Sequence, residues 1–185
     1  MFFSRALFSL LAVGAIGALA SPAPVVEKRE DVSDVLAVVG NLKATTDVIL
    51  PQIDSLVDSG AATDANLSPL LQDLATALDT SSSELDSLKG KVDPNTGGTK
   101  DEVAQEVSVV YTDVTKSLNN LKTKKPHLWY LIPKFGLEAA LIKLLLGLEL
   151  VLAGVLTLVA GLLKLVGGLL TGIGFVLLKL VLGLH

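Results

Sequence analysis

The chain has 185 residues, of which 50% are hydrophobic, 4% are aromatic and none is cysteine. Without cysteine it cannot be a disulfide-stabilised coat protein, so it must depend on helix packing or on self-association. Residues 30–115 carry 16 acidic side chains against four lysines, whereas residues 116–185 carry eight lysines against two acidic side chains. The acidic part should stay in water and disfavours nucleic-acid binding, while the basic, apolar end should be drawn to a surface.

Residues 1–20 are typical of a secretory signal peptide. Arg5 supplies the positive start, an apolar stretch follows, and Ala18-Leu19-Ala20 fits the small-x-small rule for cleavage after Ala20. The prediction is therefore a secreted, extracellular protein. An N-terminal membrane anchor is the alternative interpretation, which the short apolar stretch disfavours.

Residues 21–29 are interpreted as a pro-segment. The segment ends at the dibasic pair Lys28-Arg29, and acidic residues follow directly. This arrangement resembles the maturation site of secreted fungal precursors that a furin-like protease cleaves. Cleavage there would start the mature chain at Glu30, although the same residues also fit an ordinary charge cluster.

Apolar residues at helical spacing predict an acidic three-helix bundle, the head, over residues 30–122. The first helix is expected from Asp31 to Ser59, with Pro51 either kinking or splitting it. The second is expected to begin at Ser68-Pro69, a cap residue followed by proline at the first helical position, and to end at Gly90.

The third helix of the head has the clearest start signal. Thr99 and Glu102 form a capping-box pattern, and the helix is expected to end at the lysines before Pro126. Between the first two helices, Asn66-Leu67-Ser68 is a pattern for glycosylation of Asn66, which Pro69 directly after it disfavours.

Residues 123–136 form a junction that contains lysines, prolines and most of the aromatic residues of the mature chain. Trp129, Tyr130 and Phe135 stand here beside an apolar segment, which is the composition of an anchor at a water–lipid interface. The equally weighted alternative is a hinge whose aromatic side chains pack between the head and the C-terminal part.

Residues 137–185 form a hydrophobic, Gly- and Leu-rich helical tail with only five charged residues. Four glycines seven residues apart would share one face of a helix and allow another backbone to approach closely: Gly147, Gly154, Gly161 and Gly168. A single helix of this length would be about 72 Å long, about twice the apolar thickness of a bilayer. The tail is therefore expected to be a broken helix or a helical hairpin, with Gly167-Gly168 as the favoured break and with Gly172 and Gly174 as further weak points. Chance spacing of glycines in a Gly-rich tail is the alternative.

The sequence favours no enzyme, cofactor or metal site. The chain has two histidines, His127 and His185, and lacks the HExxH, GxSxG and phosphate-loop patterns. The acidic side chains of the head are most simply a solvated surface. The expected class is all-α, with an acidic three-helix head followed by the hydrophobic tail.

This layout resembles the small, cysteine-free, secreted hyphal-surface proteins of mushroom-forming fungi. The resemblance covers the mature chain and depends on its order: signal peptide, dibasic site, hydrophilic helical half and a Leu- and Gly-rich run over residues 144–184. A weaker resemblance, over Asp31–Leu121, is to the fungal hydrophobic-surface-binding proteins. These resemblances imply cell-wall or hyphal-surface localisation and a role in aerial growth and attachment, and they supply no catalytic residues.

The function expected from these observations is that of a secreted, surface-active amphiphile. The tail would contact hydrophobic surfaces, the cell wall or a lipid interface, and it could self-associate, while the acidic head keeps the outer side wet. One alternative is a membrane-inserting protein, lytic in one version, whose tail forms a hairpin. Another is an oligomeric structural protein whose tails form a shared core.

Overall fold

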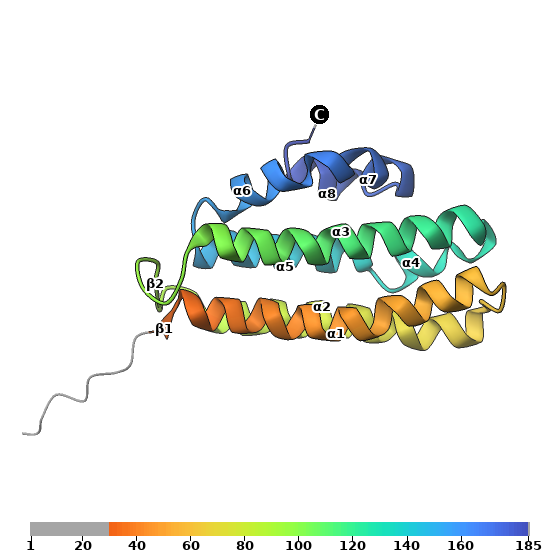
Figure 1. Ribbon diagram of the computed structural model, residues 1–185, viewed down its shortest axis with the longest axis horizontal. Coiled ribbons are helices and arrows are strands. Elements are labelled where there is room, and N and C mark those ends of the chain that lie inside the picture. Colours follow the sequence, from red (N-terminus) through yellow and green to blue (C-terminus); the bar gives the residue numbers. More distant parts are fainter. Residues whose placement is uncertain (1–29, 185) are drawn as a thin grey trace, which may run out of the picture.

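The structure is a computed structural model that describes residues 30–184. The signal-peptide, pro-segment and dibasic-site predictions, with Ala20, Lys28 and Arg29, lie outside the described residues. The described chain is almost entirely helical, as expected. Its helices form a bundle with a further layer of short helices above it (Figure 1).

Three long helices come first. They are α1 (Val32–Asp58), α2 (Asp64–Leu88) and α3 (Lys100–Lys124), and α1 packs against both of the others. Two-residue strands, β1 (Glu30–Asp31) and β2 (Val92–Asp93), pair in parallel at one end. The predicted apolar seams face the core, and along α2 they bury Leu67, Leu71, Leu74, Leu78 and Leu85.

Pro51 lies inside α1, and the helix continues to Asp58, so of the two alternatives for Pro51 the split does not occur. One predicted boundary of these helices is wrong. The second helix begins at Asp64 rather than at Ser68-Pro69, because the Asn66 side chain accepts a hydrogen bond from the Thr63 amide (2.7 Å) and so supports an earlier start. The start of α3 is confirmed: Thr99 and Glu102 form the reciprocal capping box.

The junction folds into two short turns, η1 (Pro126–Leu128) and α4 (Leu131–Lys134). The tail then continues as α5 (Leu137–Val151), which packs along α2 and so adds a fourth long helix to the bundle. Tyr111 of α3 is buried and donates a hydrogen bond to the Leu141 carbonyl of α5 (2.5 Å). The first part of the tail is thus a core element, because the buried leucines of α5, such as Leu141 and Leu145, pack into the bundle.

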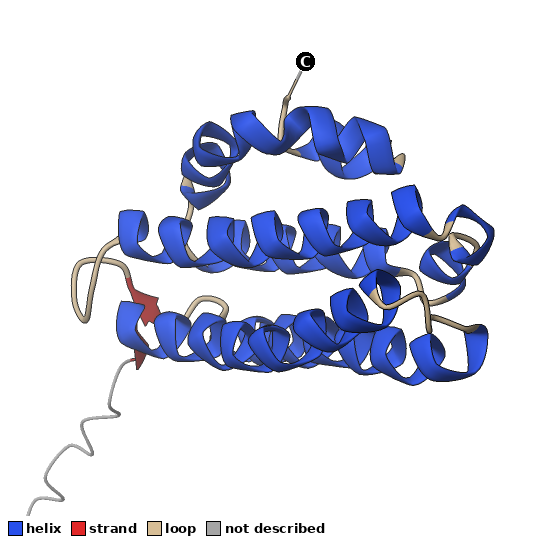
Figure 2. Ribbon diagram, turned by 45° about the vertical axis from the view of Figure 1, so that its right-hand side comes forward, coloured by secondary structure: helices blue, strands red, loops and turns tan. Residues whose placement is uncertain are grey.

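The rest of the tail forms the C-terminal layer, residues 155–184. It consists of α6 (Val155–Leu162), η2 (Leu163–Val166), α7 (Gly167–Ile173) and α8 (Val176–Val181). The helices α6 and α7 lie on α3, while α8 lies on α5. Figure 2 shows these elements as a separate tier above the bundle.

The tail is therefore a broken helix, and its break at Gly174 lies at a predicted weak point, whereas its break at Gly154 was not predicted. The chain leaves the helical conformation at Gly154 (φ +94°) and at Gly174 (φ +87°), where glycine has no Cβ to clash. The expected break at Gly167-Gly168 is wrong, since both residues are helical and lie within the continuous helical stretch Val155–Ile173.

Candidate surface-binding site

The C-terminal layer presents apolar side chains to solvent. Leu165 is 95% exposed, and further large hydrophobic residues of the layer are also exposed: Leu162, Val176, Leu177 and Leu180. Residues 150–184 contain only two charged residues, Lys164 and Lys179. We call the five exposed hydrophobic residues the outer apolar set. Exposed apolar groups concentrated in one part of a protein mark a surface for interaction.

The same layer is apolar on its underside. The residues that face the bundle are buried hydrophobic side chains: Val159, Leu163, Val166, Leu170, Ile173, Leu178 and Leu182. Helices that are hydrophobic all round belong in a protein core or in a lipid-like phase. In water, only the side of this layer that faces the bundle is shielded from solvent.

Two glutamates of α5 cap helices of the layer. The Glu149 carboxylate accepts hydrogen bonds from the amides of Gly154 (2.8 Å) and Leu156 (2.9 Å), at the start of α6. The Glu138 carboxylate accepts from Leu177 (2.9 Å) and Leu178 (3.1 Å), at the start of α8. A negative charge at a helix start satisfies free amides and opposes the helix dipole.

Two lysines of α3 donate hydrogen bonds to carbonyl groups at the C-terminal ends of helices, where the helix dipole is negative. Lys100 donates to the Ala153 carbonyl just after α5 (2.8 Å), and Lys122 donates to the Gly172 carbonyl near the end of α7 (2.9 Å). Positive charge is favourable at helix C-termini. We call Lys100, Lys122, Glu138 and Glu149 the charged caps. All four lie on the bundle, and they fix where the chain enters and turns within the layer.

The aromatic residues of the junction lie between the bundle and the layer or at the margin of the bundle. Trp129 is half-buried, its ring centroid lies 6.4 Å from that of Phe175, and the Lys122 ammonium is 4.9 Å from the Trp129 ring. Tyr130 is exposed, and its hydroxyl donates to Asp64 of α2. Phe135 is half-buried beneath Lys134. The placement of Trp129 matches the hinge alternative, in which aromatic residues pack between head and tail.

The predicted glycine stripe does not form on one helix. Gly147 lies in α5, where an added Cβ would be 3.7 Å from Leu85 of α2, so this glycine does allow close approach of two helices. Gly154 starts α6 in the left-handed conformation, and added Cβ atoms at Gly161 and Gly168 would meet nothing within 4 Å. The stripe prediction is corrected because α5 ends at Val151, before the second glycine.

Asn66 has a structural use in the fold. Its side-chain oxygen accepts from the Thr63 amide, and its nitrogen donates to the Ala61 carbonyl (2.8 Å). The glycosylation prediction for this residue stays a prediction. A carbohydrate linked there would compete for the amide that helps to start α2.

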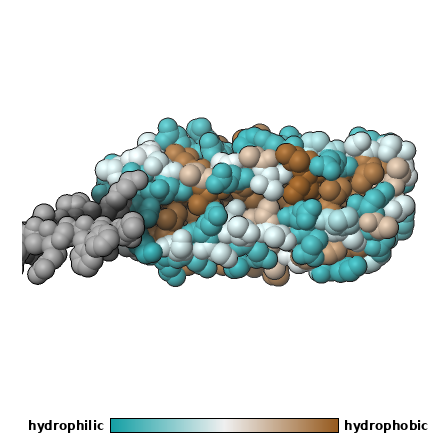
Figure 3. All heavy atoms as spheres, turned by 90° about the horizontal axis from the view of Figure 1, so that it is seen from below, coloured by the Kyte–Doolittle hydropathy of each residue, from teal (hydrophilic) through white to brown (hydrophobic). Residues whose placement is uncertain are grey.

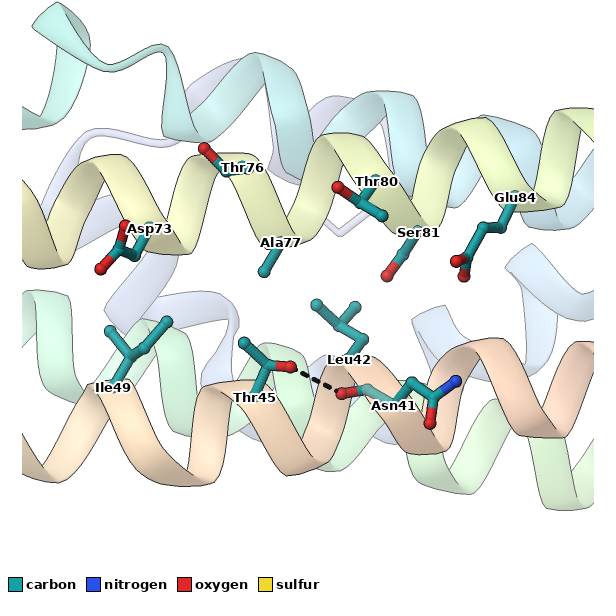
Figure 4. Close-up of a pocket in the computed structure, with 10 residues that line it drawn as sticks. All are labelled: Asn41, Leu42, Thr45, Ile49, Asp73, Thr76, Ala77, Thr80, Ser81 and Glu84. Atoms are coloured by element: carbon teal, nitrogen blue, oxygen red, sulfur yellow. Dashed lines mark hydrogen bonds between the residues drawn. The ribbon is translucent and has the colours of Figure 1, made fainter.

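The opposite side of the molecule is different in character. The face formed by α1 and α2 is largely hydrophilic, with hydrophobic atoms showing along its middle (Figure 3). An open groove of about 410 Å³ runs between these helices, with Leu42, Ile49 and Ala77 on its walls. Hydroxyl groups and the carboxylates of Asp73 and Glu84 line the rest of the groove (Figure 4). The residues that line the groove include no histidine or lysine.

Within residues 30–184, no group of three or more His, Cys, Asp or Glu side chains is arranged to hold a metal ion. One helical stretch there, Val155–Ile173, is long and apolar enough to cross a membrane by length and composition. A third of its most apolar window (33%) is buried against the bundle, and the stretch contains the 3-10 segment η2 with Lys164. By these criteria it is a candidate for insertion as well as a layer of a folded protein.

No protein-family model matches the chain. Over 95 residues it is 41% identical to fruiting body differentiation protein 16 of Flammulina velutipes, an alignment that covers 49% of this chain and 73% of that protein. The chain belongs to the family of that protein. Membership of the fruiting body differentiation protein 16 family agrees in part with the resemblance inferred from layout, since the relative comes from a mushroom-forming fungus.

The outer apolar set was missed by the sequence argument as a distinct surface. Periodicity marked the whole tail as apolar, and it could not separate residues that face the bundle from residues that face solvent. The charged caps were also missed. Glu138, Glu149 and Lys100 are ordinary surface residues by sequence, and only their neighbours in space give them a role.

Proposed function

We propose that the protein is a secreted, surface-active amphiphile that coats or attaches hyphae at hydrophobic interfaces or at the cell wall. The outer apolar set would meet the apolar phase, and the hydrophilic face of α1 and α2 would stay in water. The observation that carries the proposal is the exposure of Leu165, Leu177 and Leu180 on a layer with only two charged residues.

Three features support this proposal. The surface of the layer is apolar, whereas residues 30–115 carry a large excess of acidic side chains. The C-terminal layer and the helices α1 and α2 lie on opposite sides of the molecule (Figure 1), so one orientation can place the layer in an apolar phase and α1 and α2 in water. The relative's role in fruiting bodies suits growth from a wet substrate into air, where hyphae cross a phase boundary.

The test uses residues 30–185 and two sets of substitutions on exposed positions. In the first variant Leu165, Leu177 and Leu180 are replaced by serine. Moving one leucine side chain out of an apolar phase costs roughly 1.5–3 kcal/mol, so binding to polystyrene should weaken at least about tenfold. The lowering of surface tension at the air–water interface should weaken in parallel.

The matched control replaces Val48 and Val109, which are 62% and 42% exposed on α1 and α3, by serine. This variant removes exposed apolar groups from outside the layer, so its adsorption should stay within about twofold of the parent's. Equal adsorption by the layer variant and the parent would contradict the proposal. So would a parent that binds neither polystyrene nor the air–water interface.

The second candidate function is membrane insertion, which Val155–Ile173 favours by its length and composition. It predicts leakage of vesicles and association with membranes that resists carbonate extraction. Adsorption to polystyrene and air without vesicle leakage supports the first candidate. Leakage at comparable protein concentration supports the second.

A further inference from the structure

The long helices beneath the C-terminal layer also pack directly against one another. Their core contacts join α1 to α3, α1 to α2 and α2 to α5, and none of these pairs includes a helix of the layer. The buried hydrogen bond from Tyr111 to Leu141 joins α3 to α5 directly. These contacts do not require the layer.

The margin of the contact between the layer and α3 is polar. Asp101 and Gln105 are exposed beside α6, and Asn119 and Lys122 are half-buried beside Gly172 of α7. These groups already contact water, so they add little cost when the layer separates from α3.

The layer is connected to the bundle through a short link that contains Gly154. The chain turns there in the left-handed conformation between α5 and α6, and glycine adopts other conformations with equal ease. The remaining attachments are the apolar underside and the charged caps. An apolar phase can replace the first, because hydrophobic burial depends on removing area from water and not on a particular partner.

We infer that the layer is a detachable unit: at an apolar boundary, residues 155–184 separate from α3 and α5 and spread, so that the underside as well as the outer apolar set meets the apolar phase. This inference rests on the proposed function and concerns how the same surface works. In solution the charged caps and the bundle keep the underside covered. At the boundary, contact with the apolar phase replaces contact with the bundle.

A reversible covalent link tests the inference. The Asn119 side chain approaches Gly172, with its Oδ1 3.8 Å from a Cβ added there, so the double variant Asn119→Cys and Gly172→Cys places two thiols on facing positions of α3 and α7. The chain has no other cysteine, so formation of the bond is measured by loss of free thiol. Reduction restores the unlinked protein in the same sample.

The matched control places a disulfide inside the layer. A Cβ added at Gly167 would lie 3.9 Å from the Leu184 Cβ, so Gly167→Cys with Leu184→Cys links α7 to the chain end and leaves the layer free to leave the bundle. Both oxidised variants have the same number of introduced cysteines. They differ in whether the link crosses from the layer to α3.

Oxidised protein linked from α3 to α7 should desorb from polystyrene at least about tenfold faster than the parent, with recovery on reduction, while the oxidised control should match the parent. Parent-like adsorption by the oxidised α3–α7 variant would overturn the inference and leave the proposed function standing. Failure of the unmodified protein to adsorb would reject the proposed function itself. Equal loss in the control would also overturn the inference, since the link to the bundle would then not be the cause.

Trp129 gives an independent measurement in the unmodified chain. It is the single tryptophan, and it lies between Lys122 and Phe175, where α3 meets the turn into α8. Separation should shift its emission when the protein adsorbs to polystyrene particles. Identical emission in solution and on the particles would contradict separation, whether or not the engineered disulfide forms.

Discussion

The first three helices and the helices of the C-terminal layer are both rich in aliphatic residues, yet their N-termini are capped in different ways. The helix α1 is capped by its own neighbours: Asp31 accepts from the Ser33 amide, and Asp34 accepts from the Asp31 amide. The starts of α6 and α8 are capped by Glu149 and Glu138, which belong to α5. The first kind of helix carries its own end signals, while the second depends on the bundle for them.

This difference separates a part that specifies itself from a part that is held in place. Each of the helices α1, α2 and α3 has one apolar seam that packs in the core and a charged outer side that contacts water. The layer has apolar residues on both sides and borrows its caps from elsewhere. The comparison suggests that the layer is the part of the molecule that responds to its surroundings.

Truncation gives the largest effect that this comparison predicts. Deleting residues 152–185 should leave a helical protein that melts cooperatively and no longer adsorbs to polystyrene. Deleting residues 137–185 should abolish cooperative unfolding, because it also removes the buried leucines of α5: Leu137, Leu141, Leu144, Leu145 and Leu148. Each buried leucine contributes about 2–5 kcal/mol on truncation, against a typical total stability of about 5–15 kcal/mol.

Circular dichroism during thermal unfolding measures both deletions. A cooperative transition in the protein that lacks residues 137–185 would show that α5 is not part of the bundle core. Loss of helix in the protein that lacks only residues 152–185 would show that the layer is needed for the fold, and it would remove the distinction between the two regions.

Two leucines of the tail sharpen the comparison at the level of single side chains. Leu145 of α5 is fully buried, whereas Leu165 of η2 is 95% exposed. Leu145→Ala should lower the free energy of unfolding by about 2–5 kcal/mol, and Leu165→Ala should change it by less than about 0.5 kcal/mol. Chemical denaturation measures both. Similar losses in the two variants would mean that the two halves of the tail are packed alike.

The contact between α3 and α5 predicts a dependence on alkaline pH. Burial raises the pKa of the Tyr111 phenol well above its ordinary value, so the folded protein keeps this group neutral where the unfolded chain ionises it. Stability from this residue is complete below about pH 10 and is lost as pH rises further. Tyr111→Phe should remove that part of the alkaline loss. It should also cost about 1–3 kcal/mol near neutral pH, since the Leu141 carbonyl loses its donor.

Melting temperature from pH 8 to 12 measures this effect, with Tyr130→Phe as the control. A hydrogen bond to Asp64, with smaller contributions from desolvation and the carboxylate charge, raises the pKa of Tyr130, but this residue is exposed and screened by solvent. The control should therefore retain most of the alkaline loss of the parent. An unchanged alkaline loss in Tyr111→Phe would contradict the assignment to the buried phenol.

The sequence predicted what is encoded locally. The seams of α1, α2 and α3 follow from helical periodicity. The start of α3 follows from Thr99–Glu102, a span of four residues that contains the whole capping signal. The start of α2 was misplaced because Ser68-Pro69 is a stronger pattern than the Thr63–Asn66 pair that is used. The role of α5 could not be predicted, because a segment with apolar residues on every side does not show which of its faces packs against another helix.

The break at Gly154 shows the same limit from another side. The tail has many glycines, and adjacent Gly167-Gly168 is locally the weakest helical point. The chain turns at Gly154 because α5 has reached the end of the bundle there, and because Lys100 and Glu149 satisfy the exposed ends of the two helices. Those contacts join residues that no local sequence pattern connects. Local sequence likewise does not show which residues of the C-terminal layer face the bundle and which face solvent.

The charged caps give the smallest predicted effect and the most local one. Glu138→Gln and Glu149→Gln keep a hydrogen-bond acceptor but remove the charge that opposes the dipoles of α8 and α6, so each should cost about 0.3–1 kcal/mol. Faster hydrogen exchange should appear in residues 155–181, with little change in α1, α2 and α3. Glu84→Gln on α2 is the control, because that side chain caps neither α6 nor α8 in the described chain. Exchange that rises equally in the bundle would mean that the layer and the bundle open together, and the layer could then not leave α3 as a unit.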